Sequence, residues 1–405
     1  MVTSRRSLLG GVLTVGGAGF FTRRARAQGR PIRIGVMNDQ SGPNSSGAGT
    51  GSNTAARMAA EDFGSSVIGL PIEVLIADHQ NKPDVGAAIV RKWYDEDGVD
   101  IVVDISHSGV ALAVQEITRM RDRIVIYGEV GSTLLTESAC SPNGFSWIYD
   151  AYALTNALVS AIAKKGFGTW YLLVVDYAFG QSLEAEARLA VGRSGGKVLG
   201  AVRHPNGNPD FSAYLLQAQA SGAQVLGLMN GGDDLVGSLK QAREFGMLGT
   251  GHAVAAPLVV ITDVNAMGLE VAQGLTFATG FYWDRTEATR QFARRFFARH
   301  GIMPTMGHAA DYSAVTHYLK AVAATGTREA RSVLAQMRAT PVRDFYCDNG
   351  YLRVDGRLMH DMYLARVKKP SQSAYAWDYY ELLDTIPAEA AFRPLSQSKC
   401  PLVRT

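Results

Sequence analysis

From Pro31 onward the chain alternates short runs of β-branched residues with stretches of helical period. This alternation is typical of a parallel sheet covered by helices on both faces, because each parallel crossover needs a connection of helix length. The first series predicts strands at 32–36, 72–76, 101–103 and 124–126, separated by helices at 51–63, 83–94 and 110–120. The pattern therefore predicts the α/β fold class.

The same rhythm begins again near Asp150. This second series predicts helices at 152–164, 181–194, 212–220 and 234–245, with strands at 170–175, 197–202 and 225–228. The tail adds helices at 287–300, 309–324 and 327–338, and antiparallel strands at 350–354 and 361–367 that we expect at the edge of an existing sheet. The 405 residues less the first 27 leave 378, more than one ordinary core holds. Two doubly wound lobes are expected, with one extended sheet as the alternative.

The first 27 residues differ from the rest of the chain. Arg5 and Arg6 precede a weakly apolar run, 8–21, and Ala25-Arg26-Ala27 offers small residues for cleavage after Ala27. A membrane anchor needs roughly 20 apolar residues, and this run is shorter and contains five glycines. We interpret 1–27 as a twin-arginine signal that directs the protein to the periplasm. No cysteine follows the cleavage site, so a lipid anchor is not expected, nor is membrane insertion after cleavage.

The charge balance argues against a polyanion as partner. The chain has 40 basic and 37 acidic residues, but the signal holds five arginines and no acid, so the remainder has 35 against 37, or −2. Nucleic-acid binding needs a retained excess of Lys and Arg, and no such partner is expected. Cys140, Cys347 and Cys400 lack metal-ligand spacing, and His308 to Tyr312 reads as one helix face, so we predict no metal and no cofactor. One disulfide or three buried thiols both fit this count.

In open parallel sheets, ligands bind beyond the carboxyl ends of the strands, so the loops there are the candidate site. The loop 38–43 and the Gly/Ser segment 45–51 lead into a helix whose N–H groups suit a carboxylate, but the glycines lack phosphate-loop spacing. Ser108 follows the third strand and would cap a helix while offering its hydroxyl to an anion. A hydrolase with Ser108 and His107 would need a nucleophile elbow and an orienting acid, neither of which is present, so no enzyme is expected.

Three further loops carry polar or aromatic side chains. Glu129 and Gly131 follow the fourth strand, while Tyr177 and Phe179 follow the matching strand of the second series and would bury an apolar ligand body. Asp233 and Asp234 follow another strand; we expect Asp234 to cap the next helix and leave Asp233 open between capping and pairing with a cation.

Several short passages, in their order and spacing, resemble one family. They are 78–84 (DHQNKPD), 176–180 (DYAFG), 210–212 (DFS), 215–220 (LLQAQA) and 360–363 (HDMY). Over 31–400 the chain resembles the type I periplasmic solute-binding proteins of ABC importers, the group of the leucine/isoleucine/valine-binding proteins. It is most similar to a branch that takes branched-chain amino acids, aromatic acids or other small carboxylates.

The resemblance implies two α/β lobes joined by a hinge of three crossings, with the ligand closed between them as in a Venus flytrap. Lobe I would comprise 31–149 and 277–341, and lobe II 150–276 and 342–398. The implied partners are a small-molecule carboxylate and an ABC permease in the inner membrane, and the protein would act as a monomer. A ligand-sensing receptor subunit of the same fold is the alternative function.

The resemblance also assigns roles to single residues. Ser108 matches the serine that binds the ligand carboxylate, and Glu129 and Gly131 lie on the second loop of that anion site. Phe179 matches the aromatic that stacks on the ligand, and Tyr177 neighbours it. Two further positions are implied, Asp233, where amino-acid binders carry tyrosine, and Tyr312, on the helix that returns to lobe I. Cysteines at 140 and 400 match a pair in this branch, which implies a disulfide that leaves Cys347 free.

Two departures from the family pattern bear on the ligand. Gly131 stands where a threonine usually helps to hold the carboxylate, and Leu258 stands where an acid usually pairs the ligand ammonium. Loss of a buried charge partner costs several kcal/mol unless another acid replaces it. Either Asp233 or Glu129 supplies the charge, or the ligand is a carboxylate without an amine, such as an aromatic or keto acid. The sequence favours the second alternative.

Overall fold

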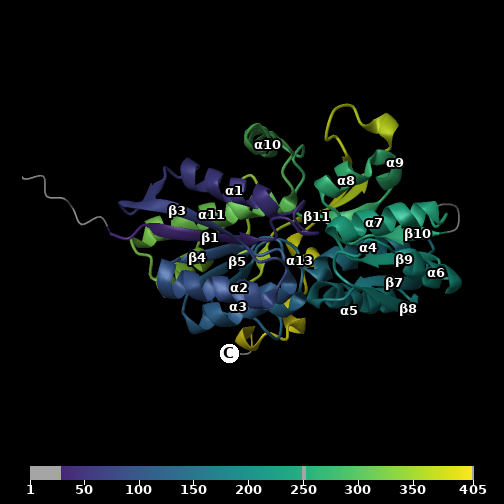
Figure 1. The fold of residues 1–405 in the computed structure, drawn as a ribbon, viewed down its shortest axis with the longest axis horizontal. Coiled ribbons are helices and arrows are strands. Elements are labelled where there is room, and N and C mark those ends of the chain that lie inside the picture. Colours follow the sequence, from purple (N-terminus) through teal and green to yellow (C-terminus); the bar gives the residue numbers. More distant parts are fainter. Residues whose placement is uncertain (1–28, 249–251, 404–405) are drawn as a thin grey trace, which may run out of the picture. The chain divides into compact units, whose positions relative to one another are not determined.

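The computed structural model describes residues 29–248 and 252–403. The proposed export signal and its cleavage site fall outside these residues. From Pro31 onward the chain forms one compact unit. None of the helices in the described ranges is long and apolar enough to cross a membrane. The α/β class predicted from the sequence is confirmed by parallel-rich sheets covered by helices (Figure 1).

A six-stranded sheet carries the first series, in the order β2-β3-β1-β4-β5-β6. Its strands are β1 (Ile32–Asn38), β2 (Ser66–Val67), β3 (Leu70–Asp78), β4 (Ile101–Asp104), β5 (Ile124–Tyr127) and β6 (Gly144–Ser146). All pairs are parallel except β2 with β3. Ile34, Val103 and Ile126 belong to one buried cluster while Met37 and Val102 belong to another, because alternate residues of a strand face opposite sides of the sheet.

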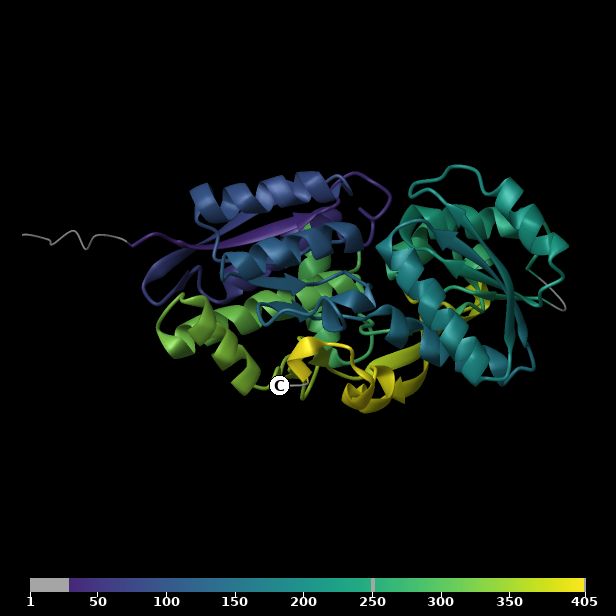
Figure 2. The same ribbon diagram turned by 90° about the horizontal axis from the view of Figure 1, so that it is seen from below.

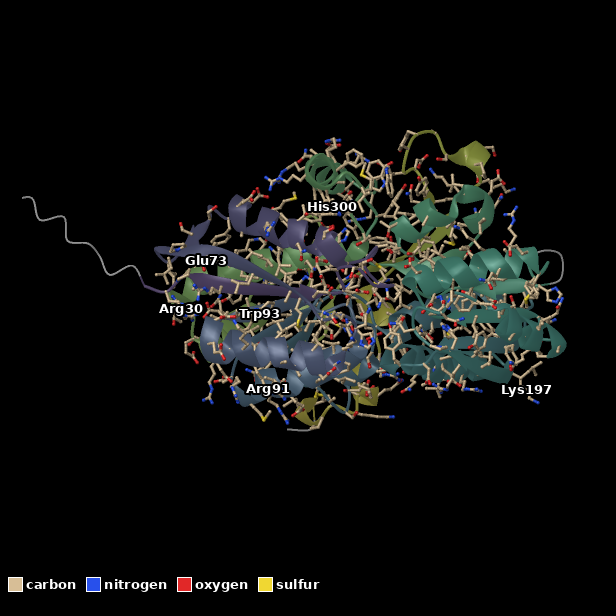
Figure 3. All side chains as sticks on the ribbon, in the orientation of Figure 1. Arg30, Glu73, Arg91, Trp93, Lys197 and His300 are labelled. Atoms are coloured by element: carbon tan, nitrogen blue, oxygen red, sulfur yellow. A yellow bond between two sulfur atoms is a disulfide. The ribbon has the colours of Figure 1, made fainter. Side chains whose placement is uncertain are left out.

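Helices cover both faces of this sheet. Helix α1 (Gly49–Asp62) packs against α11 (Met306–Thr325), and α2 (Pro83–Lys92) packs against α3 (Ser108–Met120), with the two pairs on opposite faces (Figure 1). A π-helical turn, 93–97, continues α2 and buries Trp93 (Figure 3). A side chain on Gly35 of β1 would come within 2.4 Å of the Trp93 ring, so the strand needs glycine there. We call this sheet with its helices the first half.

The second series forms a parallel four-stranded sheet in the order β10-β9-β7-β8. Its strands are β7 (Thr169–Val175), β8 (Lys197–His204), β9 (Val225–Met229) and β10 (Ala253–Ala255). The helices of this region are α4 (Ala151–Ala163), α5 (Ala178–Arg193), α6 (Ser212–Ala220), α7 (Gly232–Glu244), α8 (Ile261–Met267) and α9 (Leu269–Ala272). We call this sheet with its helices the second half.

The tail departs from the expected edge additions. Strands β11 (Thr276–Thr279), β14 (Met362–Val367) and β15 (Tyr380–Ile386) form a separate antiparallel sheet, and β12 (Tyr351–Leu352) pairs only with β13 (Leu358–Met359). The antiparallel pairing was foreseen, but these strands join neither large sheet. Helices α10 (Glu287–His300), α12 (Ala330–Ala339) and α13 (Ala388–Ala391) complete the tail, with short 3-10 turns at 133–136 (η2), 370–372, 395–397 and 401–403.

A buried arginine holds the segment that leads from β6 to α4. The Arg357 guanidinium donates to the carbonyl oxygen of Ile148 at 3.1 Å and to Asp150 Oδ2 at 3.1 Å, and also reaches the carbonyls of Ser146 and Tyr149. Its side chain is 1% exposed, so these acceptors replace the water that the two terminal nitrogens have lost, while Nε has no hydrogen-bond partner among the described residues. The division into lobes at 149/150, 276/277 and 341/342 stays a prediction, and this segment spans the first of those boundaries.

Cys140 and Cys400 form a disulfide that spans 260 residues. Cys347 is a buried free thiol, and burial raises its pKa to about 12. The segment around Cys400 is therefore joined covalently to the loop that follows η2 in the first half.

Candidate functional site

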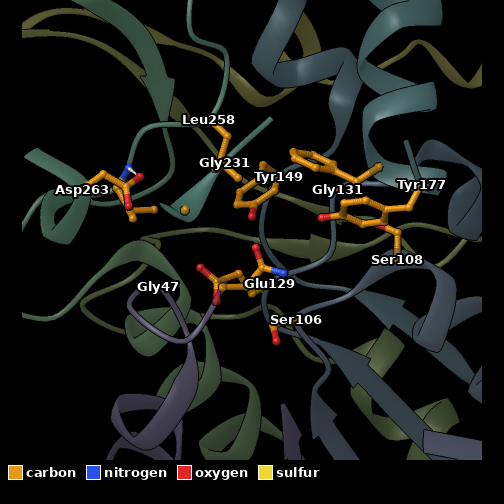
Figure 4. A pocket seen from close by; sticks show the side chains of 14 residues that line it. Gly47, Ser106, Ser108, Glu129, Gly131, Tyr149, Tyr177, Gly231, Leu258 and Asp263 are labelled. Atoms are coloured by element: carbon orange, nitrogen blue, oxygen red, sulfur yellow. Dashed lines mark hydrogen bonds between the residues drawn. The ribbon is translucent and has the colours of Figure 1, made fainter. Parts of the chain in front are cut away.

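A small cavity, with about 30 Å³ open to the centres of water-sized spheres, lies between the first and second halves (Figure 4). Loops that follow the carboxyl ends of strands in both sheets form its wall, as expected for open parallel sheets. The lining residues are Asn44, Gly47, Ser106, Ser108, Glu129, Gly131, Tyr149, Tyr177, Phe179, Gly231, Gly232, Leu258, Val260 and Asp263.

The start of α3 gives the cavity a set of hydrogen-bond donors. Asp104 and Ile105, which precede α3, adopt left-handed backbone conformations with φ of 74° and 60°. This conformation is strained, and it is especially unusual for Ile105 because its side chain is β-branched. This bend is followed by Ser106, whose Oγ accepts a bond from the Asp39 N–H at 3.0 Å. His107 is the N-cap and its ring accepts from the Val110 N–H, so Ser108 is the first helical residue and not the cap that the sequence predicted. The unpaired N–H groups of such a first turn suit a carboxylate.

Glu129 also lines the cavity, on the loop that follows the neighbouring strand β5. Its carboxyl packs directly on the backbone of Gly47 and Gly307. A Cβ on Gly47 would lie 2.7 Å from Oε1 of Glu129, and a Cβ on Gly307 would lie 3.1 Å from its carboxyl carbon. The other oxygen, Oε2, is buried and has no hydrogen-bond partner among the described residues. Burial raises the pKa of Glu129 well above its usual range, and the nearby carboxyls of Asp104 and Asp311 raise it further.

A second buried acid, Asp263, enters the cavity from the first turn of α8. Its Oδ2 accepts from the Val260 N–H at 3.1 Å, while Oδ1 is buried without a partner in the described chain. Burial raises the pKa of Asp263 to about 7, although the Val260 bond opposes the shift. The sequence reasoning missed this residue. The available signal was an acid five positions after Leu258, beyond the unrecognised short strand β10.

Aromatic side chains form the remaining wall and meet across the two halves. The Tyr177 ring of the second half stacks on His107 of the first half, with centroids 4.3 Å apart and planes 11° apart. The Phe179 ring occupies the space beside Gly131, where a Cβ would come within 2.4 Å of it and within 3.2 Å of Tyr149. Glycine at 131 therefore allows Phe179 to close this side of the cavity.

Five of the seven predicted ligand-binding residues line this cavity. They are Ser108, Glu129, Gly131, Tyr177 and Phe179, and Leu258 lines it too. Their contact with a ligand stays a prediction. Among residues that the sequence did not single out, Tyr149, Asn44 and Asp263 add polar groups to the wall.

Asp233 and Tyr312 do not line the cavity. The Asp233 N–H donates to the Pro43 carbonyl at 3.0 Å, a bond between the halves, while its neighbour Gly232 reaches the cavity. Asp234 accepts from the Gly207 and Asn208 N–H groups, so it ties a loop to α7 instead of capping the helix as expected.

Tyr312 lies on another face of α11. Its phenol donates to Asp62 Oδ2 at 2.6 Å, and its ring packs on Phe292 and Phe345. Nor does His107 form a base for Ser108, because its Nδ1 accepts the N–H of Val110 and its ring stacks on Tyr177. In the described ranges no three acid, His or Cys side chains are grouped to hold a metal ion.

A family model described as "Periplasmic binding protein" matches residues 31–373. A solved periplasmic binding protein from Burkholderia mallei is 45% identical, with a TM-score of 0.90 over 92% of this chain and 99% of its own. A branched-chain amino-acid ABC transporter periplasmic ligand-binding protein from Burkholderia xenovorans is 39% identical, with a TM-score of 0.82 over 92% and 100%. The curated "Leu/Ile/Val-binding protein homolog 6" of Brucella melitensis is 25% identical over 85% of this chain and 89% of its own.

Proposed function

The chain belongs to the periplasmic binding protein family, and on that premise we propose that its ligand is a small zwitterion, an α-amino acid with an apolar or aromatic side chain. The protein is the extracytoplasmic solute-binding component of an ABC importer, which implies a small-molecule ligand and a permease as partners. The proposal concerns which ligand the cavity takes and which residues hold it.

One observation carries the proposal: the cavity wall contains two buried acids and no base. Of the described lining residues, Glu129 and Asp263 are the carboxylates, and none is Lys, Arg or His. A buried carboxylate without a counter-ion is costly, and here the cost appears as raised pKa values. A ligand ammonium would supply a cation and favour the ionised form of the acids that it contacts.

The other groups of an amino acid also find complementary surfaces. The first turn of α3, with the Ser108 hydroxyl, offers donors to the carboxylate. Tyr149, Phe179 and Leu258 provide apolar surface for the side chain. Leu258 stands where related proteins usually carry the acid that pairs with the ligand ammonium. In this proposal Asp263 and Glu129 take over that role.

An amine-free carboxylate, which the sequence favoured, fits the same cavity less well. Its negative charge would lie in a buried space that already holds Glu129 and Asp263, so both acids would have to stay protonated. The two ligand classes therefore predict opposite pH dependences. Binding of a zwitterion requires ionised acids and tightens as the pH rises through about 7, the pKa of Asp263, whereas binding of an amine-free acid weakens over the same range.

Isothermal titration calorimetry of refolded residues 28–405 tests the proposal. L-Leucine and L-phenylalanine would be compared with 4-methylpentanoate and 3-phenylpropionate, their deaminated counterparts, at pH 5.5 and 8. We expect binding of the amino acids alone, tighter at pH 8. Asp263→Asn and Glu129→Gln should each weaken it by about tenfold or more, since each removes one partner of a buried ion pair. Tighter binding of the deaminated acids, strengthened at pH 5.5, would overturn the proposal.

We also propose the cellular context that the sequence suggests. Residues 1–27 act as a twin-arginine signal, the mature protein is a monomer in the periplasm, and it releases its ligand chemically unchanged. Mass spectrometry of the protein from a periplasmic extract should find Gln28 as the first residue. Mass spectrometry of the ligand recovered after binding should find no conversion.

A further inference from the structure

The last residues of the chain run back over both halves. We call residues 387–403, which follow β15, the C-terminal strap (Figures 1 and 2). Its far end is joined to the first half by the Cys140–Cys400 disulfide, and the Lys399 N–H donates to Glu137 Oε2 at 2.8 Å. Its near end contacts the second half, where α13 packs against α4.

Arg393, in the middle of the strap, binds one acid from each half. Its Nε lies 2.9 Å from Oε1 of Glu137, which follows η2 in the first half, and its Nη2 pairs with Oε1 of Glu186, on α5 in the second half. The guanidinium also lies over the Tyr152 ring, 4.6 Å from its centroid. Arg353 fixes the strap backbone by donating to the Arg393 carbonyl at 2.8 Å.

This bridge is largely shielded from water. The side chains of Arg393, Glu137 and Glu186 are 17%, 12% and 6% exposed, far less than those of an ordinary surface ion pair. Shielded pairs are screened less by salt, and removal of one partner leaves the others with a desolvated charge. Without Arg393, two carboxylates from opposite halves would face each other.

The bridge lies on the same two segments that carry the cavity wall. Gly131 precedes η2, and Phe179 lies in the first turn of α5. Between the cavity and the bridge, the Ser132 and Ser182 hydroxyls of these segments are 3.2 Å apart. Separation of the bridge would therefore move α5 away from η2 and widen the cavity.

We propose that Arg393 is a positioning residue that sets the equilibrium between the closed and open arrangements of the two halves. It does not touch the ligand. It acts by joining Glu137 to Glu186, while the disulfide keeps the strap on the first half. Ligand affinity then depends on Arg393 through the fraction of protein that is closed, because a ligand that needs the closed form binds in proportion to that fraction.

A distance measurement tests the proposal without a ligand. Spin labels at Arg91→Cys on α2 and Lys197→Cys on β8 would report the separation of the halves by pulsed electron paramagnetic resonance; both native side chains are exposed (Figure 3). Arg393→Met should shift the distance distribution in ligand-free protein, and Arg393→Lys, which keeps the charge, should restore much of it. Glu186→Gln removes only the ion pair between Arg393 and the second half, and it should shift the distance distribution in the same direction. This variant replaces Arg393→Met in the test if Arg393→Met does not fold.

A binding measurement adds the functional consequence and rests on the proposed function. With L-phenylalanine as the probe, Arg393→Met should raise Kd about tenfold, mainly through a faster off-rate, with no change in preference over 3-phenylpropionate. A lower melting temperature combined with an unchanged distance distribution would show a purely structural role and overturn the proposal. If the unmodified protein does not bind L-phenylalanine, the ligand assignment fails while the distance measurement still decides the role of Arg393.

Discussion

The contact between Gly131 and Phe179 gives the sharpest test of how the cavity closes. In Gly131→Ala the new Cβ would lie 2.4 Å and 2.7 Å from two ring carbons of Phe179, distances that real Cβ atoms essentially never show. Gly131 does not have a positive φ, so alanine meets no backbone strain there and the effect is purely steric. Because Phe179 belongs to the second half and Gly131 to the first, this collision occurs only when the halves are together; the new Cβ would also lie 3.2 Å from Tyr149, a milder clash.

The magnitude follows from the cost of overpacking. Adding a methyl group to a filled site costs about 1–3 kcal/mol. If this cost destabilises only the closed form, ligand affinity falls by about five- to 150-fold. The ligand-free protein can relieve the collision by opening, so its melting temperature should change little. The loss should appear instead as a higher Kd and a smaller rise of melting temperature with ligand.

Calorimetry and thermal melts of three variants would check this reasoning. Gly168→Ala is the matched control, because Gly168 has no positive φ and a Cβ there would meet nothing within 4 Å. Adding Phe179→Leu to Gly131→Ala should recover part of the affinity by giving the methyl group room. If Gly131→Ala binds as tightly as the unmodified protein, Phe179 does not close against position 131 and the argument is refuted.

Three further predictions concern the thiols, the acids and the buried arginine. Alkylation of the denatured, unreduced protein should modify one cysteine, Cys347, and modification of three would exclude the disulfide. The ligand-free protein should lose roughly 1 kcal/mol of stability between pH 6.5 and 8 from Asp263 alone, because a carboxyl with a pKa of about 7 keeps a proton when folded that it releases near pH 4 when unfolded. Urea melts should show a smaller decline in Asp263→Asn. Arg357→Met should destabilise the fold by about 3–5 kcal/mol in the same melts, since it leaves Asp150 buried without its partner; a loss below 1 kcal/mol would contradict this.

The parts of the fold that follow from periodicity were predictable from sequence. Helix 287–300 has the predicted bounds, and strands β1, β3, β4 and β5 lie where runs of β-branched residues stand. The strands that were missed are short or have little apolar alternation, such as β10 with three residues. Separate antiparallel sheets in the tail could not be foreseen, because partner choice depends on where the chain returns in space and not on local pattern.

The site was predictable only where it follows a recognised strand. Helix α11 was placed correctly, but Tyr312 is on the wrong face for the cavity. Gly307 and Asp311, four residues apart and so on one face, are the residues that lie beside Glu129 and the Gly128 backbone. One residue around a helix is a rotation of about 100°, which changes which side chain meets a ligand. Asp263 was missed because neither β10 nor α8 was recognised, so no strand end pointed to it.

The contacts between the halves near the cavity are modest individually, and this bears on how a ligand acts. They include the Asp233 N–H to Pro43 carbonyl bond, the Ser132 and Ser182 hydroxyls, and the stack of Tyr177 on its histidine. Neutral hydrogen bonds contribute about 0.5–1.5 kcal/mol each, so closure is a small balance that a ligand can decide. In the ligand-free protein, burial of the Glu129 and Asp263 carboxyls disfavours closure. A ligand ammonium would reduce the free-energy cost of burying these two groups. Changes at the strap should therefore scale all affinities alike, whereas changes at Glu129 or Asp263 should alter which ligand is preferred.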